Sequence, residues 1–196
     1  MGALLAVLAP LRLVNEAALA VGRAIGVVAV AAMVVAILIQ VFFRYVLNSA
    51  LPWPDEAARF CMLWMTGLMA PTAFRRGGFV AIDTLVQLLP KRAGAILSLV
   101  LLFLSLLVMI VAVRIGWSEV TGFAGKFATA SLYVPTDFSF ETWLRVPRSW
   151  MMASLLVGLI LLISVNIELI LRSIVKLMGG GDKLPAITIE EQVGAE

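Results

Sequence analysis

The chain of 196 residues is 62% hydrophobic and only 14% charged, whereas an ordinary soluble domain is about half apolar and roughly a quarter charged. Its net charge of +3 is small and scattered along the chain, so nucleic-acid binding is not expected. No histidine occurs, and the single cysteine, Cys61, excludes an internal disulfide framework. The chain therefore lacks the usual ligand of a membrane haem and a common ligand of zinc or non-haem iron. Composition predicts a membrane protein without a cofactor.

The first ten residues, MGALLAVLAP, carry no Lys or Arg ahead of their apolar positions, so we expect them to be retained rather than cleaved as a signal peptide. Apolar side chains from Leu4 to Leu11 recur at helical spacing and predict a short helix on the inner membrane surface. The first span follows at about 21–43, a length that crosses roughly 30 Å of hydrocarbon. Gly22 and Gly26 within it favour a close contact with another helix.

The second predicted span is short, because only fifteen charge-free residues separate Arg59 from Arg75. Pro54 suits a first helical position, and the acids Asp55 and Glu56 suit the positive end of a helix dipole. The span then covers about 55–74, with Arg59 one turn inside, where it can reach the headgroups or pair with Asp55.

Pro71 lies inside this second span and deprives the carbonyl of Gly67 of its helical partner. A small residue at that carbonyl relieves the steric clash, so we expect a kinked helix rather than a broken one. Beyond the span, apolar residues between Val80 and Pro90 recur at helical spacing and predict an interfacial helix. The third span is expected at about 93–113.

The outer connection, 114–148, is expected to continue the third span as a helix to about Ser131 and then to become irregular around its prolines. The fourth span follows at about 149–171. We expect one membrane domain, 1–178, and a flexible cytoplasmic tail, 179–196, because the chain becomes polar and acidic after three glycines.

Four spans place both termini on one side of the membrane, and the basic residues indicate which side. Nine Lys and Arg residues fall on the side of the termini and six on the other. Because short cytoplasmic loops are enriched in Lys and Arg, both termini are expected in the cytoplasm. The fold class is therefore an all-α membrane protein with four transmembrane helices and short interfacial helices.

The centres of the four predicted spans contain no ionisable residue, although ion-moving membrane proteins usually keep one there. No phosphate-binding glycine loop, nucleophile motif or metal-ligand cluster occurs either. We therefore expect no enzyme activity and no metal, and interpret the chain as one that serves other proteins.

The segment from Trp53 to Pro90 contains the motifs WPDEAARF, GLMAPTAFRRGGFVAIDTL and LLP. These motifs resemble the small membrane subunit of tripartite ATP-independent periplasmic (TRAP) transporters, the DctQ-type family, whose members are short four-span proteins. Phe79 departs from the family pattern, which usually has histidine there. The candidate partner-interface or family-motif residues are Trp53, Asp55, Glu56, Arg59, Trp64, Arg75, Arg76, Gly78 and Asp83.

The resemblance implies partners. In such systems a large, many-spanned permease subunit moves substrate and sodium, and a soluble periplasmic substrate-binding protein delivers the substrate. The small subunit braces the large one in the bacterial inner membrane, so the resemblance implies a part in sodium-driven uptake of an organic acid.

Three other classes of protein have the same apolar composition. A haem-bearing membrane anchor is disfavoured because histidine is absent, and a proton-coupled exporter is disfavoured because no span has a central carboxylate. The alternative that remains is a generic four-span membrane assembly factor with no transport role.

Overall fold

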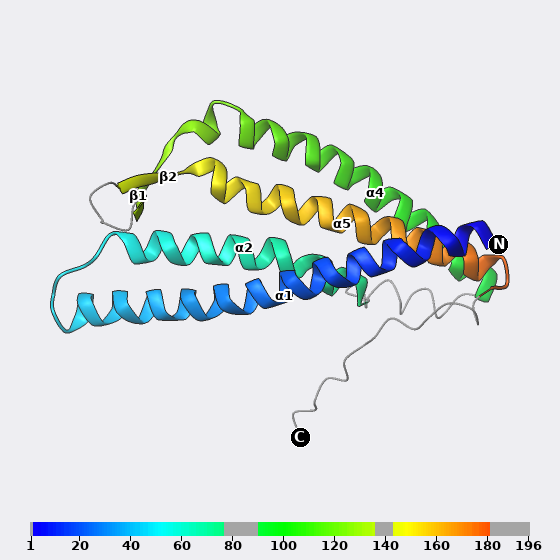
Figure 1. Ribbon diagram of the computed structural model, residues 1–196, viewed down its shortest axis with the longest axis horizontal. Coiled ribbons are helices and arrows are strands. Elements are labelled where there is room, and N and C mark those ends of the chain that lie inside the picture. The colour runs from blue at the N-terminus through cyan, green and yellow to red at the C-terminus, as the bar shows by residue number, and fades with distance from the viewer. Residues whose placement is uncertain (1, 77–89, 136–142, 181–196) are drawn as a thin grey trace, which may run out of the picture.

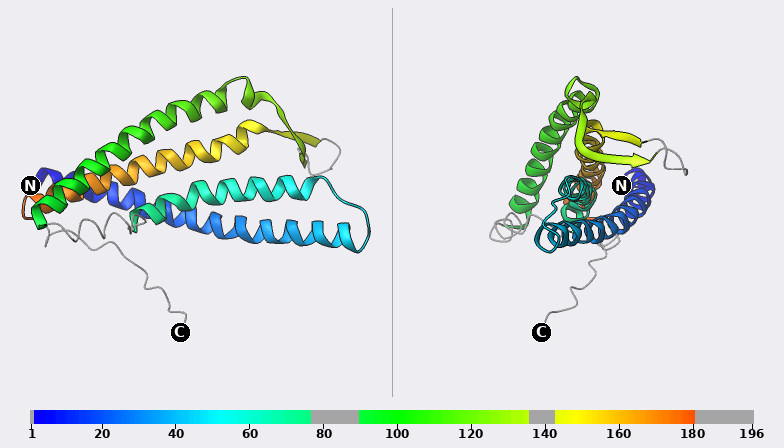
Figure 2. Two further views of the ribbon diagram at one scale, coloured as in Figure 1. Left: turned by 180° about the vertical axis from the view of Figure 1, so that it is seen from behind. Right: turned by 90° about the vertical axis from the view of Figure 1, so that its left-hand side faces the viewer.

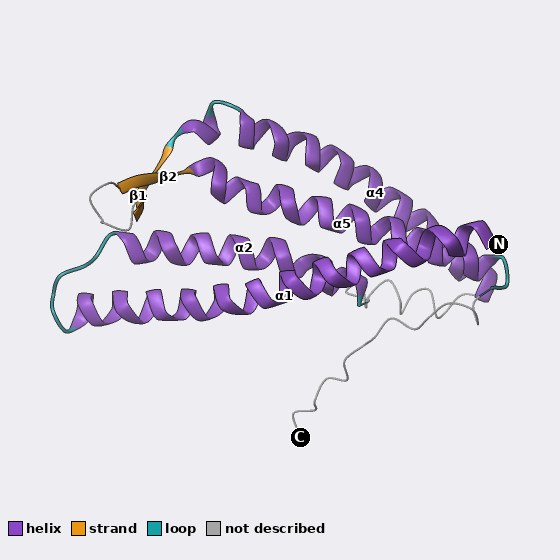
Figure 3. Ribbon diagram, viewed as in Figure 1, coloured by secondary structure: helices purple, strands orange, loops and turns teal. Residues whose placement is uncertain are grey.

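The computed structural model describes residues 2–76, 90–135 and 143–180, and its helices dominate this part of the chain (Figure 1 and Figure 3). The elements, in chain order, are α1 (Gly2–Tyr45), α2 (Trp53–Arg75), α4 (Lys91–Thr121), the 3-10 turn η1 (Ala124–Lys126), β1 (Ala128–Pro135), β2 (Trp143–Pro147) and α5 (Arg148–Leu177).

The helices run lengthwise, with α2 between α1 and α5 and with α4 packed on α5 (Figure 1 and Figure 2). The turn between α1 and α2 lies at the same end of the molecule as β1 and β2, which we call the hairpin end. The start of α1 and the end of α5 lie at the opposite end, which we call the terminal end. Both chain ends of the helical body are therefore on one side of it.

Three of these helices are long and apolar enough to cross a membrane: Ala6–Tyr45, Ala93–Thr121 and Arg148–Leu177. They agree with the predicted mainly helical fold with long apolar helices, to which the described residues add one β-hairpin. Helix α2 is the least apolar of the four long helices in the described residues and is not among the three. The four-span count and the side on which the termini lie therefore remain predictions.

Helix α1 is continuous from Gly2, so the short separate helix expected before the first span is instead its beginning. Its 44 residues correspond to about 66 Å at 1.5 Å per residue. This length exceeds the roughly 30 Å of a hydrocarbon core about twofold. The first half of the helix carries the polar residues Arg12, Asn15, Glu16 and Arg23, whereas residues 24–43 have no charge. The apolar half alone is long enough to span.

The connection before α5 differs from the prediction, because α4 ends at Thr121 rather than near Ser131. Strands β1 and β2 then form an antiparallel hairpin in which Tyr133 faces Arg145 and Val134 faces Leu144, with an irregularity nearer Ala128. β-branched and aromatic residues favour strands, and each strand ends at a proline, which cannot donate a ladder hydrogen bond. The prediction that the helix of the third span continues to about Ser131 is therefore wrong.

Glycines allow the helices to approach closely at two places. Gly22 and Gly26 of α1 face Leu68 and Met69 of α2, so the predicted contact of this pair with another helix is confirmed. Gly67 of α2 and Gly158 of α5 also meet, and a Cβ atom on Gly158 would lie 2.6 Å from the Gly67 carbonyl oxygen. The carbonyl freed by Pro71 thus lies against α5, and α2 continues unbroken to Arg75.

A small apolar core joins the helices toward the terminal end. Leu19 of α1, Phe74 of α2 and Val165 of α5 are buried together, and α4 contributes the partly buried Leu102 and Met109. On the α4–α5 side, the Asn166 amide donates to the Ser105 hydroxyl at 2.6 Å. All of the expected interfacial helix except Pro90, and most of the expected tail, lie outside the described residues.

Replacing Gly158 with Ala should weaken the contact between α2 and α5, because the added Cβ would overlap the Gly67 backbone. Overpacking of this kind costs about 1–3 kcal/mol. The measurement is the unfolding midpoint of the detergent-solubilised protein, followed by tryptophan fluorescence. The matched control is Gly116→Ala, whose Cβ would lie 3.6 Å from Leu156 Cδ1, an ordinary contact. Equal midpoints for the two variants would contradict the close crossing.

Candidate functional site

Glu56, in the first turn of α2, holds the β-hairpin against the helix. Its carboxylate accepts hydrogen bonds from the backbone N–H groups of Ala130 at 2.9 Å and Ser131 at 2.5 Å, and from the Ser131 hydroxyl at 2.6 Å. The same hydroxyl lies 2.8 Å from the Pro52 carbonyl oxygen. Bonds to an ionised carboxylate are stronger than neutral ones. Glu56 therefore joins the start of α2 to the segment that leads from α4 into α5.

The other acid of this pair has a different environment. Asp55 is exposed, and its carboxylate accepts one long hydrogen bond, at 3.5 Å, from the Gln40 amide of α1. The predicted pair between Asp55 and Arg59 does not occur among the ion pairs of the described residues. The two neighbouring acids thus separate into an anchor, Glu56, and an exposed charge, Asp55.

A second cluster lies at the terminal end and is centred on Glu168 of α5, whose side chain is 0% exposed. One carboxylate oxygen of Glu168 accepts from Arg75 of α2 at 2.8 Å and from Arg172 of α5 at 3.1 Å. The other accepts from the Asn15 amide of α1 at 2.8 Å. Asn15 also accepts a hydrogen bond from the Ser164 hydroxyl at 2.6 Å. We call Asn15, Glu16, Arg75, Glu168 and Arg172 the ion network.

The rim of the ion network is more exposed than its centre. Arg75 is 9% exposed and also lies 3.4 Å from the carboxylate of Glu16, whose side chain is 39% exposed. Glu16 in turn pairs with Arg12, four residues earlier on α1, at 3.2 Å. A buried carboxylate is tolerated only when paired and hydrogen-bonded. The two arginines and the amide satisfy that condition and connect three helices.

The residues predicted from the sequence are therefore separated along the molecule. Trp53, Asp55, Glu56 and Arg59 lie in the first two turns of α2 at the hairpin end, and only Glu56 contacts another element through a short hydrogen bond. Arg75 lies at the opposite end of the same helix, in the ion network.

Trp64 is half-buried in the middle of α2 and packs near Phe60, with ring centroids 6.3 Å apart. Its buried indole N–H has no hydrogen-bond partner among the described residues. Arg76 forms the C-cap of α2, where its backbone N–H reaches the Thr72 carbonyl. Gly78 and Asp83 lie outside the described residues. The positions of Trp64 and Arg76 do not test the site roles predicted for them.

Asn15, Glu168 and Arg172 were not predicted as a site. The local signal was the spacing of Glu168 and Arg172, four residues apart in an otherwise apolar helix, which places opposite charges on one face. The partners on α1 and α2 are 153 and 93 residues away along the chain. Pairing over such separations is not visible in one sequence.

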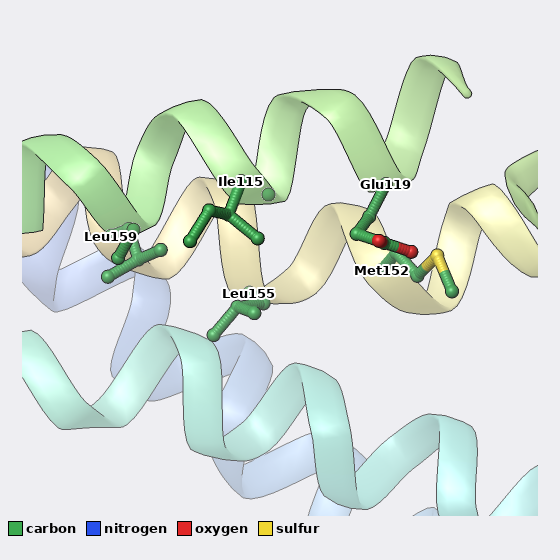
Figure 4. A pocket seen from close by; sticks show the side chains of 7 residues that line it. Ile115, Glu119, Met152, Leu155 and Leu159 are labelled. Carbon is green, nitrogen blue, oxygen red and sulfur yellow. The ribbon is translucent and has the colours of Figure 1, made fainter.

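A shallow groove of about 370 Å³ lies between α4 and α5 toward the hairpin end (Figure 4). Ile115, Met152, Leu155 and Leu159 line it, and Glu119 is its one charged lining residue. Sites for polar small molecules combine an apolar pocket with several convergent polar groups. This groove lacks that combination. Across the described ranges, no group of three or more acidic or cysteine side chains is placed to hold a metal ion.

Comparison with known protein families identifies a matching family. The family model described as "Tripartite ATP-independent periplasmic transporters, DctQ component" matches residues 33–176. The matched range runs from the apolar half of α1 to the end of α5 and includes most of the ion network. No curated protein sequence matches the chain.

Replacing Glu168 with Gln should destabilise the fold strongly, because two buried arginines lose their counter-charge. Removing one partner of a buried ion pair costs about 3–5 kcal/mol. Glu16→Gln is the matched control. It removes the charge of a half-exposed carboxylate that also pairs with Arg75, and should cost about 0–1 kcal/mol. Unfolding in mixed micelles of increasing denaturing-detergent fraction measures both. Similar losses from the two variants would contradict the central role of Glu168.

Proposed function

The chain belongs to the DctQ component family of tripartite ATP-independent periplasmic transporters, and we propose that it braces the large permease subunit of such a transporter. Members of this family are components of transporters, so the role of the chain concerns transport rather than catalysis. The observation that carries the proposal is the family match over residues 33–176, most of the helical body. The proposed transport is sodium-driven uptake of an organic acid that a periplasmic substrate-binding protein delivers.

The environment of Glu168 supports a bracing role rather than sodium binding. Both of its oxygens already accept hydrogen bonds, one from two arginines and the other from Asn15. Ion sites in secondary transporters need carboxylates or unwound carbonyls that exchange between two exposed states. The Glu168 carboxylate is instead fixed in a salt-bridged contact between three helices, which favours a fixed structural part.

We also propose that α2 crosses the bacterial inner membrane as a fourth span and that both termini are cytoplasmic. Two observations support this arrangement. The hairpin and the α1–α2 turn share one end of the molecule and the helical termini share the other. Nine of the fifteen Lys and Arg residues lie in the segments that the sequence assigns to the side of the termini, as expected for the cytoplasmic side. A single membrane domain, 1–178, is part of the same proposal.

Labelling by an impermeant thiol reagent tests this topology. In a chain with Cys61→Ser, a cysteine at Ala50, in the α1–α2 turn, should react from the periplasm. A cysteine at Gly180, beyond α5, should react only after the cells are opened. The reverse pattern would overturn the orientation, and labelling of both positions from the periplasm would exclude four spans.

The transport proposal predicts that liposomes containing this chain and its large subunit take up an organic acid only when the binding protein and an inward sodium gradient are both present. Omitting this chain should abolish uptake. Replacing sodium by potassium is the matched control for the ion. Uptake at full rate by the large subunit alone would contradict the bracing role.

The same liposomes distinguish bracing from ion coupling. Asp55 is the suitable residue, because Glu56 holds the hairpin whereas Asp55 is exposed and makes only one long hydrogen bond. Asp55→Asn should lower the uptake rate in a salt-dependent way if the hairpin end meets the binding protein. The reversal potential of transport should not change. A shifted reversal potential would mean that this chain takes part in coupling.

A further inference from the structure

One side of helix α2 packs on neighbouring helices, and its other side is exposed in the described residues. Leu68, Pro71 and Phe74 are buried, and Arg75 reaches into the ion network. These contacts place α2 between α1 and α5 (Figure 1). The remaining side of α2 carries exposed side chains in the part of the chain that the structure describes.

On the open side, Arg59, Met62, Leu63 and Thr66 adjoin one another over two turns, and Ala73 lies seven positions beyond Thr66. Each of these five exposed residues lies three, four or seven positions from another of them along the helix. This spacing places them on one face. We call them the α2 stripe: Arg59, Met62, Leu63, Thr66 and Ala73. Within the described residues, the Arg59 guanidinium has no ion pair or hydrogen bond. The Thr66 hydroxyl is satisfied by the Met62 carbonyl at 2.9 Å.

The composition of the stripe suits a protein better than lipid. A cation in contact with acyl chains must reach the headgroups or be paired, whereas arginine and methionine are enriched at contacts between proteins. The exposed faces of α1 and α4 differ, because they present long runs of aliphatic and aromatic side chains. Examples are Val27, Val28, Val34 and Val35 on α1 and Val100, Phe103, Leu104 and Leu107 on α4.

We infer that the α2 stripe is the face on which the large permease subunit docks, through a membrane helix that presents a carboxylate or carbonyl acceptor to Arg59. This inference rests on the proposed function, since it names the surface through which the bracing acts. An acceptor on the partner helix would supply the ion pair or hydrogen bond that Arg59 lacks within the described residues. The flexible Met62 side chain would adapt to the partner's surface.

Photo-crosslinking in the intact complex tests the assignment. A benzophenone amino acid at Met62 or Thr66, in membranes containing both subunits, should form a covalent adduct with the large subunit. The matched controls are Leu104 and Leu107, exposed on α4, which should give adducts with lipid only. Arg59→Glu should reduce the large subunit that co-purifies by about tenfold, because like charges repel. Arg59→Lys should retain it.

The outcomes separate the inference from the proposed function. Co-purification with adducts only from α4 would overturn the stripe while leaving the bracing role intact. Adducts from Met62 or Thr66 with lipid alone, or with a second copy of this chain, would also overturn it. A complete failure of the large subunit to co-purify with the unmodified chain would instead contradict the proposed function. If Arg59→Glu fails to accumulate, the adducts from Met62 and Thr66 decide.

Discussion

The fold depends on the neutralisation of one buried carboxylate. Glu168 is fully enclosed, and it is held by guanidinium groups from α2 and α5 and by an amide from α1. An unpaired charge in such a place is prohibitively costly, so the three helices must arrive together in one register for the site to be satisfied. The apolar contact of Leu19, Phe74 and Val165 lies on the same three helices. Burial and charge pairing therefore specify the same arrangement.

Close backbone contacts between helices contribute to helix association, which apolar burial alone does not drive inside a membrane. Lipid tails are as apolar as leucine, so helices associate through packing and hydrogen bonds. Gly67 and Gly158 allow α2 and α5 to meet backbone to backbone. On α1, Gly22 faces the Leu68 backbone carbonyl of α2, and Gly26 makes room for the Met69 side chain. Asn166 and Ser105 add a hydrogen bond between α5 and α4. The α1–α2, α2–α5 and α4–α5 pairs thus each have a close glycine contact or a hydrogen bond between the helices.

The sequence predicted the features that depend on local chemistry. Helix α2 was expected at about 55–74 and runs from Trp53 to Arg75, because a proline start, two acids and a basic end are local signals. The hairpin was missed because the first residues of β1 were expected to continue the helix to about Ser131, and the rest of β1 was expected to be irregular. The ion network was missed because its charges lie far apart in the chain. The separate roles of Asp55 and Glu56 were equally invisible, since only the position of the hairpin distinguishes them.

The attachment of the hairpin by Glu56 has a mechanical meaning when considered with the glycine contact and the ion network. The contact between Gly67 and Gly158 would by itself be a pivot, about which α2 and α5 could rotate like the blades of scissors. The Glu56 carboxylate restrains the pair on one side of that pivot, and Arg75 with Glu168 restrains it on the other. Two restraints on opposite sides of a pivot remove the rotation. The angle between α2 and α5 is therefore set at three places along their length, which are the hairpin, the glycine crossing and the ion network.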